Sequence, residues 1–376
     1  MTLEVRAITA AQHATFISTR PWVPIQQTPG WGRGHVTGRY ESIGWFDKDF
    51  LVGAGLARYR GLPRLPMRSV ASFHSGPDID WTGLGLRALR PKDWLDPLVE
   101  HLRSRGAFTA RVGPMTSAHV WPGFHPTAVS QGTELAIRAS QPPTHQADQA
   151  HERLRQAGWR VMRTARKRFL AEVPLPNRQA RPPDPPGGGT PTPRPAGRRG
   201  RGTPTPRPAG RRGRGLTIRP GDVSDLDKVA SAIGAAHPHE DAHSPERMHD
   251  MWRGLAGDDH DRVRLLVAES MGDICYGSMF AIVGAKAWDL SENLTEPTSN
   301  AAAVLALRTR MLAESTAAGA TAFVVPSGPV PEGALMPRIA WGWPSVRLTE
   351  LLPSFQYPVR ATWHSTLTPI VNRMVR

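Results

Sequence analysis

Two short motifs contain residue types at spacings that support known chemistry. The segment Gln27-Thr-Pro-Gly30-Trp-Gly32 has the Gln-x-x-Gly-x-Gly spacing with which some enzymes cradle the pyrophosphate of coenzyme A. The segment His239-Glu240-Asp241-Ala242-His243 has the His-Glu-x-x-His spacing of zinc proteases. Each motif works only on a particular backbone, so the flanking residues decide whether either chemistry is expected.

The first motif lacks the flanking elements that coenzyme A binding requires. A pyrophosphate is held by backbone amides at the start of a helix, so the loop must follow a strand and lead into a helix. Here the motif is followed by "RGHVTGRYESIG", in which glycine, threonine and valine make a poor helix. The sequence therefore does not favour a coenzyme A loop.

The second motif lacks the continuous helix that a catalytic zinc requires. Both imidazoles must lie on one helical face, with the glutamate beside the metal-bound water. Pro238 precedes the motif, and Ser244-Pro245 is a helix start signal immediately after it. We therefore predict that the two histidines straddle a loop and a helix start, and we expect no metal site.

The sequence offers no covalent nucleophile. It has no Gly-x-Ser-x-Gly elbow and no Walker loop. The single cysteine, Cys275, lies in the apolar run "ICYGSMFAIV", where a buried structural thiol is expected. Any chemistry has to come from positioned substrates and polar side chains.

The first half of the chain predicts antiparallel strands followed by a helix and a further strand. Period-two patterns indicate the strands, and an apolar stripe closed by Gly106 indicates the helix. The predicted strands are 39–46, 50–60, 67–73 and 107–112, and the predicted helix is 92–106.

The second half repeats this order of elements. Strands are predicted at 262–268, 274–283 and 321–325, and a helix is predicted at 301–318 after Asn300 as its cap. Further helices are predicted at 148–158, 224–233 and 244–255. The duplication predicts an α/β (α+β) fold with a similar mixed-sheet unit present twice.

A segment rich in proline, glycine and arginine separates the halves. The thirteen residues "TPTPRPAGRRGRG" occur at 190–202 and again at 203–215. Nine arginines and one aspartate in 181–215 supply about half of the net charge of +15. This composition cannot bury a core, so we predict a disordered basic linker at 178–215 between an N-terminal domain, 1–177, and a C-terminal domain, 216–376. Two interpretations stay open, an arm that neutralises RNA phosphates and a solvated spacer.

Length and hydropathy set the broad class of the protein. A chain of 376 residues fits two domains of ordinary size. It contains no run of 18 apolar residues, and its N-terminus lacks the basic start and apolar core of a signal peptide. We expect a cytoplasmic protein without a transmembrane segment.

Four segments of the first half resemble the Fem family, whose members use aminoacyl-tRNA to build the interpeptide bridges of peptidoglycan. The segments are "IQQTPGWGR", "ESIGWFDKDFLVGAGLARYRGLPRLP", "SGPDIDW" and "DPLVEHLRSRGAFTARVGP". The resemblance covers about residues 5–175 and is looser in the second half. It implies two acetyltransferase-like (GNAT-like) domains, and it makes the opening motif part of a substrate cleft.

The resemblance also implies the candidate site residues. His35 stands where the family has a basic residue four positions after the tryptophan, with Arg33 two positions earlier. In the second half, "FVVPSGPV" replaces an aromatic-Asp-x-x-Gly segment, and "PRIAWGW" offers Arg338 in place of a Phe-Lys pair. We expect Trp31 and Arg33 to bind an acidic acceptor, His35 to accept the amine proton and Arg338 to stabilise the oxyanion.

The implied activity is aminoacyl transfer from aminoacyl-tRNA to an amine of a peptidoglycan precursor. No cofactor is expected beyond aminoacyl-tRNA as co-substrate. The expected partners are that tRNA and a lipid-linked or nucleotide-linked muropeptide, which leaves peripheral contact with the inner face of the cell membrane open. Two alternatives remain: transfer to a small-molecule acceptor, and a degenerate non-catalytic relative that binds precursor or RNA.

Overall fold

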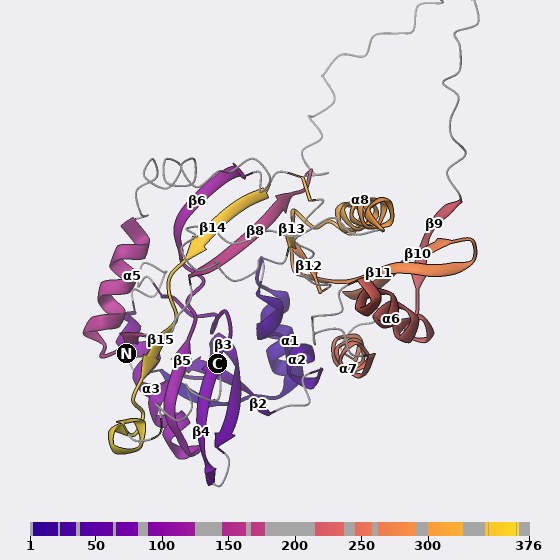
Figure 1. Ribbon diagram of the computed structural model, residues 1–376. Coiled ribbons are helices and arrows are strands. Elements are labelled where there is room, and N and C mark those ends of the chain that lie inside the picture. The colour runs from indigo at the N-terminus through magenta and orange to yellow at the C-terminus, as the bar shows by residue number, and fades with distance from the viewer. Residues whose placement is uncertain are drawn as a thin grey trace, which may run out of the picture.

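The protein contains two mixed β-sheets with helices packed against them (Figure 1). The computed structural model describes residues 3–21, 23–34, 38–62, 65–81, 89–124, 145–162, 167–176, 215–236, 245–257, 262–290, 300–325, 343–344, 346–365 and 367. The predicted linker lies outside these residues, except for Gly215. Among the described helices, none is long and apolar enough to cross a bilayer.

The first sheet has seven strands in the order β1-β2-β3-β4-β5-β15-β7. Its neighbours are antiparallel except for the parallel pair β4 and β5. The strands are β1 (Glu4–Ala7), β2 (Arg39–Asp47), β3 (Phe50–Leu62), β4 (Leu65–Phe73), β5 (Ala107–Val112), β7 (Arg160–Val161) and β15 (Phe355–Tyr357).

The second sheet has eight strands in the order β6-β14-β8-β13-β12-β11-β10-β9. It also contains one parallel pair, β12 and β13. The strands are β6 (Ser117–Phe124), β8 (Arg168–Pro174), β9 (Leu216–Gly221), β10 (Val263–Ser270), β11 (Asp273–Val283), β12 (Lys286–Asp289), β13 (Ala322–Val325) and β14 (Val346–Leu351).

The helices form where the sequence has apolar stripes. In α3 the stripe of Trp94, Leu95, Leu98, Val99 and Leu102 is buried in the core of the first sheet, as its helical spacing predicts. The helices are α1 (Ala10–Ser18), α2 (Pro29–Arg33), α3 (Pro91–Ser104), α5 (His145–Gln156), α6 (Leu226–Ala236), α7 (Pro245–Ala256) and α8 (Ala301–Ala317), with 3-10 turns η1 (Ile25–Gln27) and η4 (Val223–Asp225).

Two details of the predicted helices differ in the structure. The helix expected at 224–233 begins as the turn η4, because the Asp222 side chain accepts a hydrogen bond from the Ser224 backbone and caps that turn. Asn300 precedes α8 as expected, but it does not cap the helix with its side chain. Its amide instead donates to the Cys275 carbonyl at 2.8 Å and ties α8 to β11.

Three segments of the chain pass from one sheet into the other. Along the chain β5 is followed by β6, β14 by β15 and β7 by β8. The adjacent strands β5-β15-β7 of the first sheet therefore continue as the adjacent strands β6-β14-β8 of the second, and Figure 1 shows β14 leading into β15. Arg168 holds this crossing together, because its guanidinium donates to Pro114 O at 2.8 Å and to Leu352 O at 3.1 Å. Burial lowers the pKa of Arg168 to about 10, which leaves it charged at neutral pH.

Each sheet contains strands from both sides of the predicted domain limits. β6 and β8 lie before residue 177 but pair in the second sheet, and β15 lies after residue 216 but pairs in the first. The division at 177 and 216 stays a prediction about the chain. We use "first lobe" for the first sheet with α1, α2, α3 and α5, and "second lobe" for the second sheet with α6, α7 and α8.

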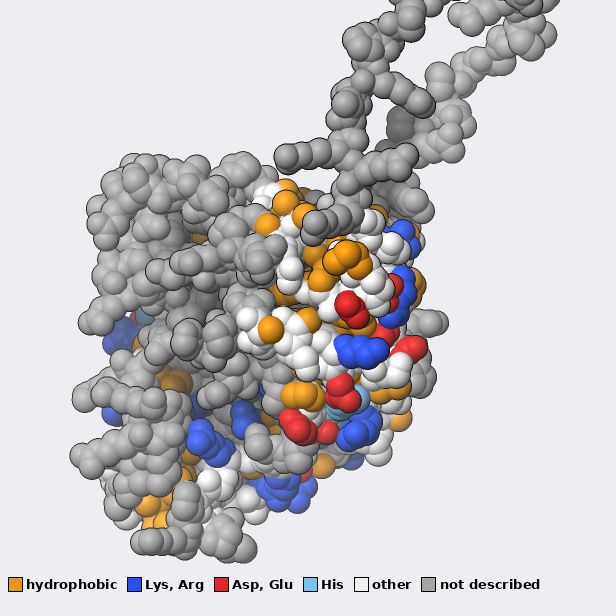
Figure 2. Space-filling model, turned by 45° about the vertical axis from the view of Figure 1, so that its right-hand side comes forward, with side chains coloured by type: hydrophobic (Ala, Val, Ile, Leu, Met, Phe, Trp, Pro, Cys, Tyr) orange, Lys and Arg blue, Asp and Glu red, His pale blue; other side chains and the backbone are white. Residues whose placement is uncertain are grey.

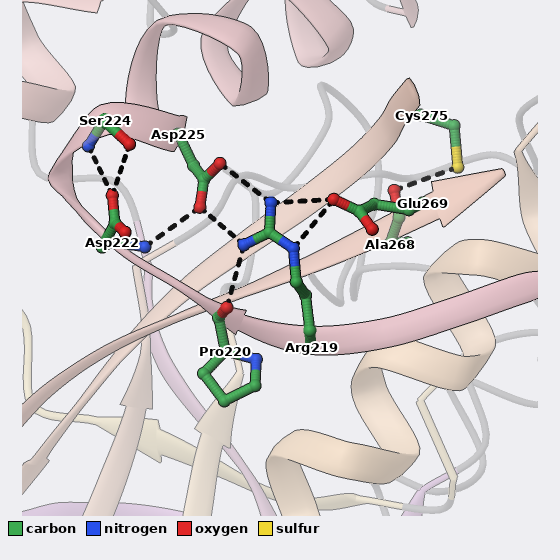
Figure 3. Close-up of polar contacts among 8 residues, drawn as sticks. All are labelled: Arg219, Pro220, Asp222, Ser224, Asp225, Ala268, Glu269 and Cys275. Atoms are coloured by element: carbon green, nitrogen blue, oxygen red, sulfur yellow. Dashed lines mark hydrogen bonds and ion pairs between the residues drawn. The ribbon is translucent and has the colours of Figure 1, made fainter. Parts of the chain in front are cut away.

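The edge strand β9 is fastened by one arginine (Figure 3). Arg219 donates to both carboxylate oxygens of Asp225, at 2.8 and 3.0 Å, and to Glu269 at 2.8 Å. These bonds raise the pKa of Arg219 and join β9 to η4 and β10.

The single cysteine, Cys275, is half-buried on β11 (Figure 3). Its Sγ donates to Ala268 O at 3.3 Å, and burial raises the pKa of the thiol. It has the character of a structural thiol.

The apolar core of the second lobe continues into the first. Phe16, Ile17, Val23 and Ile25 are buried in the same cluster as the residues of α6, α7, α8 and β10 to β13. A backbone hydrogen bond of 2.8 Å from Ala285 N to Pro21 O joins the lobes at the same place. The segment before α2 is therefore part of the contact between lobes.

Candidate functional site

Gln27 of the opening motif joins two strands that have begun to separate. Its side chain is buried, with 1% exposed. Its Oε1 accepts from Leu56 N at 2.9 Å, and its Nε2 donates to His74 O at 2.6 Å. The pairing of β3 with β4 ends at Arg58 and Ser72. Two residues further on, the side-chain amide of Gln27 bridges Leu56 and His74 in place of a direct bond between the strands. Gln27 is thus a structural clasp that fixes the start of the motif.

The next residues of the motif form the short helix α2. Thr28 caps it, because its Oγ1 accepts from Trp31 N at 3.3 Å and donates to Ile25 O at 2.8 Å. Five residues separate the end of α2 from the start of β2. The Trp31 amide at the start of α2 is therefore capped by the chain itself, and this geometry does not support a coenzyme A loop.

Gly30 of the motif and Gly34, two residues beyond it, make a close contact between α2 and α7. A Cβ on Gly254 would lie 2.2 Å from Gly34 N and 2.7 Å from Gly30 O. A Cβ on Gly34 would lie 3.0 Å from Asp250 O. Backbones approach this closely only where no side chain intervenes. Gly30 and Gly34 are therefore helix-packing residues that join the two lobes.

The structure describes two of the four predicted site residues. Arg33 is exposed at the end of α2, and its Nη2 donates to Gly254 O at 3.0 Å, in the last turn of α7. Trp31 is half-buried and packs against the core shared by the lobes. Both residues thus lie at the α2–α7 junction. His35 and Arg338 lie outside the described residues, as does the His239–His243 motif.

A row of polar side chains crosses the first sheet on the face that carries α1 and α2. Residues directly opposite each other on paired strands point to the same face. The members of this arginine row are Tyr40, Arg58, Ser72, Arg111, Gln356 and Arg160, each opposite the next. The row begins beside α2, because a Cβ on Gly32 would lie 3.2 Å from the Tyr40 Cβ.

The arginine row concentrates positive charge. Strands lie about 4.8 Å apart, so Arg58, Arg111 and Arg160 span about 19 Å. Burial lowers the pKa of Arg111, and the neighbouring Arg60 lowers it further. The pKa of His364, on the same face, is lowered by burial and then by Arg111 and Arg160. The row contains no carboxylate, and its cations repel one another.

The second lobe carries its surface charge differently. Figure 2, in which its side of the molecule comes forward, shows acidic and basic side chains interspersed. Ion pairs such as Arg253–Asp250 at 3.0 Å and Arg310–Glu314 at 2.7 Å account for this mixture. The concentration of arginines on the first sheet is therefore a local feature, and it suits a polyanion.

Comparison with known proteins identifies the fold. No protein-family model matches the sequence, and no curated protein matches it. Among solved structures, the crystal structure of FemX aligns with a TM-score of 0.63 at 11% identity, covering 97% of this chain and 99% of that chain. The chain has the fold of FemX. The Fem resemblance in the sequence is thus matched in three dimensions, and the α/β fold with two mixed sheets is confirmed.

Two further solved structures align over most of the chain with lower scores. The tandem GNAT protein from the clavulanic acid biosynthesis pathway has a TM-score of 0.40 at 12% identity, covering 95% of this chain and 98% of that chain. The C-terminal domain of a putative lysylphosphatidylglycerol synthetase from Agrobacterium fabrum has a TM-score of 0.42 at 14% identity, covering 95% of both chains.

Proposed function

We propose that the protein transfers an aminoacyl group from aminoacyl-tRNA to an amine of a peptidoglycan precursor. The observation that supports this proposal most is the FemX fold over nearly the whole chain, with the Fem-like segment Ile25–Arg33 at the contact between lobes. Both substrates carry phosphates, and the arginine row beside α2 offers the complementary charge.

The chemistry of the proposed transfer asks for positioning more than for a nucleophile on the protein. The amine of the acceptor attacks the ester carbonyl, a C–N bond forms, and the tRNA leaves through its ribose oxygen. Holding the reactants together and stabilising the developing oxyanion supplies most of the acceleration. In this proposal Arg338 stabilises the oxyanion. His35 accepts the proton that the amine loses, because imidazole titrates near neutral pH.

Acceptor binding is proposed at the rim of the α2–α7 junction. Arg33 is exposed there, and its guanidinium fork suits a carboxylate or phosphate oxygen. Trp31 would provide an apolar wall. His35 follows Gly34 directly in the sequence, so the proposed proton acceptor adjoins the same rim.

The test is the fate of a radiolabelled amino acid. The protein is incubated with a pool of labelled aminoacyl-tRNAs, a lipid-linked muropeptide and a nucleotide-linked muropeptide. Label in a muropeptide is the expected result. Label found only in an added small amine would assign the second acceptor class, and absence of transfer to any acceptor would contradict an enzymatic role.

Variants of the arginine row should weaken tRNA binding and make it less salt-dependent. Each phosphate contact that is lost lowers the slope of log K against log salt by about 0.9. We expect that reduction for Arg58→Gln, Arg111→Gln and Arg160→Gln, measured by fluorescence anisotropy from low to moderate salt. Arg155→Gln is the matched control, because Arg155 is exposed on α5, which covers the opposite face of the sheet. If the slope of log K against log salt were unchanged in all three variants, the arginine row would not contact RNA.

A further inference from the structure

One arginine of α8 lies on the buried face of the helix. Val304, Leu307 and Met311 form the apolar stripe of α8, and Arg308 falls on that stripe at helical spacing. Only 5% of the Arg308 side chain is exposed. A guanidinium in such a position ordinarily has a carboxylate or several carbonyls as partners.

Arg308 has no such partner. It makes no hydrogen bond or ion pair with any residue that the structure describes, and its Nη1 is fully buried without an acceptor. Its Cζ lies 4.7 Å from the centre of the Trp343 ring, which in turn packs on Phe323 at 5.0 Å between centres. Asp289 and Tyr276 act on it only at longer range, and burial lowers its pKa.

Arg168, which is also desolvated, shows what Arg308 lacks. Arg168 satisfies its fork with the carbonyls of Pro114 and Leu352. Among the described residues, none offers Arg308 a comparable set of acceptors, although a buried cation without hydrogen bonds costs several kcal/mol. The cation–π contact with Trp343 recovers only about 2 kcal/mol of that cost. The site is therefore suited to an anion, and the described residues supply none.

We propose that Arg308 is the centre of an anion-binding site in the second lobe, and that its ligand is a phosphate group of a substrate. The guanidinium fork fits a phosphate oxygen pair, and the buried Trp343 ring, which packs on Phe323, strengthens the bond by excluding water. Naming a substrate phosphate rests on the proposed function, under which both substrates carry phosphates.

Thermal unfolding with inorganic phosphate as the probe tests the site. In sodium phosphate, against sodium chloride of equal ionic strength, the Tm of the native protein should rise saturably. Arg308→Met keeps the volume and removes the charge. We expect a Tm in chloride that is unchanged or higher, and phosphate affinity at least about tenfold weaker. Arg310→Met, two residues along α8 on the exposed side, should respond to phosphate like the native protein.

The outcomes are decisive in both directions. A Tm of Arg308→Met well below the native value in chloride would make Arg308 a structural cation and overturn the proposal. An equal rise in phosphate for both proteins, or no saturable rise in the native protein, would also overturn it. Arg308→Lys, which keeps the charge without the fork, should restore part of the phosphate response.

Two further probes distinguish the source of the phosphate. Uridine diphosphate represents the nucleotide-linked precursor, and a short single-stranded RNA represents the tRNA end. The probe whose binding falls at least about tenfold in Arg308→Met, but not in Arg310→Met, identifies the substrate. These readouts need no transfer. A protein that binds through Arg308 but transfers nothing would refute the proposed function alone, and one that transfers with unchanged binding in Arg308→Met would refute the site alone.

Discussion

Gly254→Ala should both destabilise the protein and suppress aminoacyl transfer. The new methyl would meet the backbone of Gly34 at 2.2 Å and of Gly30 at 2.7 Å, so α2 and α7 must move apart. Overpacking of this kind costs about 3 kcal/mol of the free energy of unfolding. A shift of about 1 Å at the rim that carries Arg33 should lower kcat/KM about 100-fold. Urea unfolding and steady-state transfer measure the two effects.

Gly234→Ala is the matched control for that prediction. Gly234 lies in α6 of the same lobe, and a Cβ there would meet nothing within 4 Å. The substitution should add up to about 1 kcal/mol of stability through helix propensity, and it should leave transfer unchanged. Equal responses of the two variants would show that the α2–α7 contact has no special role.

Gln27→Met should lower the free energy of unfolding almost as much as Gly254→Ala does, through the loss of hydrogen bonds. The variant keeps the volume of the side chain but removes its hydrogen bonds with Leu56 N, which is buried, and with His74 O. Two such losses amount to about 3 kcal/mol in the free energy of unfolding. Because α2 begins two residues later, kcat/KM for transfer should also fall.

The control for Gln27 is another glutamine that bonds at the surface. Gln156 of α5 is exposed and donates to Glu152 at 3.1 Å. Gln156→Met should change the free energy of unfolding by less than about 0.5 kcal/mol. If Gln27→Met were equally mild, the clasp between β3 and β4 would not be what orders the motif.

Most elements could be predicted because their patterns are local. The stripe from Trp94 to Leu102 specifies the buried face of α3, and Gly106, which closes the predicted helix, adopts a φ of 84° just beyond α3. Strands β2 and β3 flank one tight turn, and strands β10 and β11 flank another. Lys48 in the first turn and Met271 in the second have positive φ. Local chemistry therefore determined these elements and the repeated order of the two halves.

The exchange of strands between the sheets could not be predicted. β8 pairs with β13 and β14, which lie far along the chain, and β15 pairs with β5 and β7. Strand partners at such separations leave no periodic signal in one sequence. The arginine row was missed for the same reason, because Arg58, Arg111 and Arg160 become neighbours only through strand pairing.

Part of the candidate site was within reach of the sequence. The Fem resemblance selected Trp31 and Arg33, which the structure places at the lobe junction, whereas the roles of all four predicted residues stay predictions. Arg308 carried a usable signal, because it falls four residues after Val304 on an otherwise apolar stripe. Only the structure shows that its guanidinium lies over Trp343 and has no hydrogen-bonding partner among the described residues.

Hydrogen exchange with and without a nucleotide-linked muropeptide tests the central claim, that the acceptor binds at the rim of the α2–α7 junction. The measurement compares the amides of residues 30–34 and 250–257 with those of α3, which packs on the far face of the first sheet. We expect exchange to slow at the end of α2 and the last turn of α7, with α3 unchanged. Protection confined to other elements, with saturating muropeptide bound, would contradict the claim.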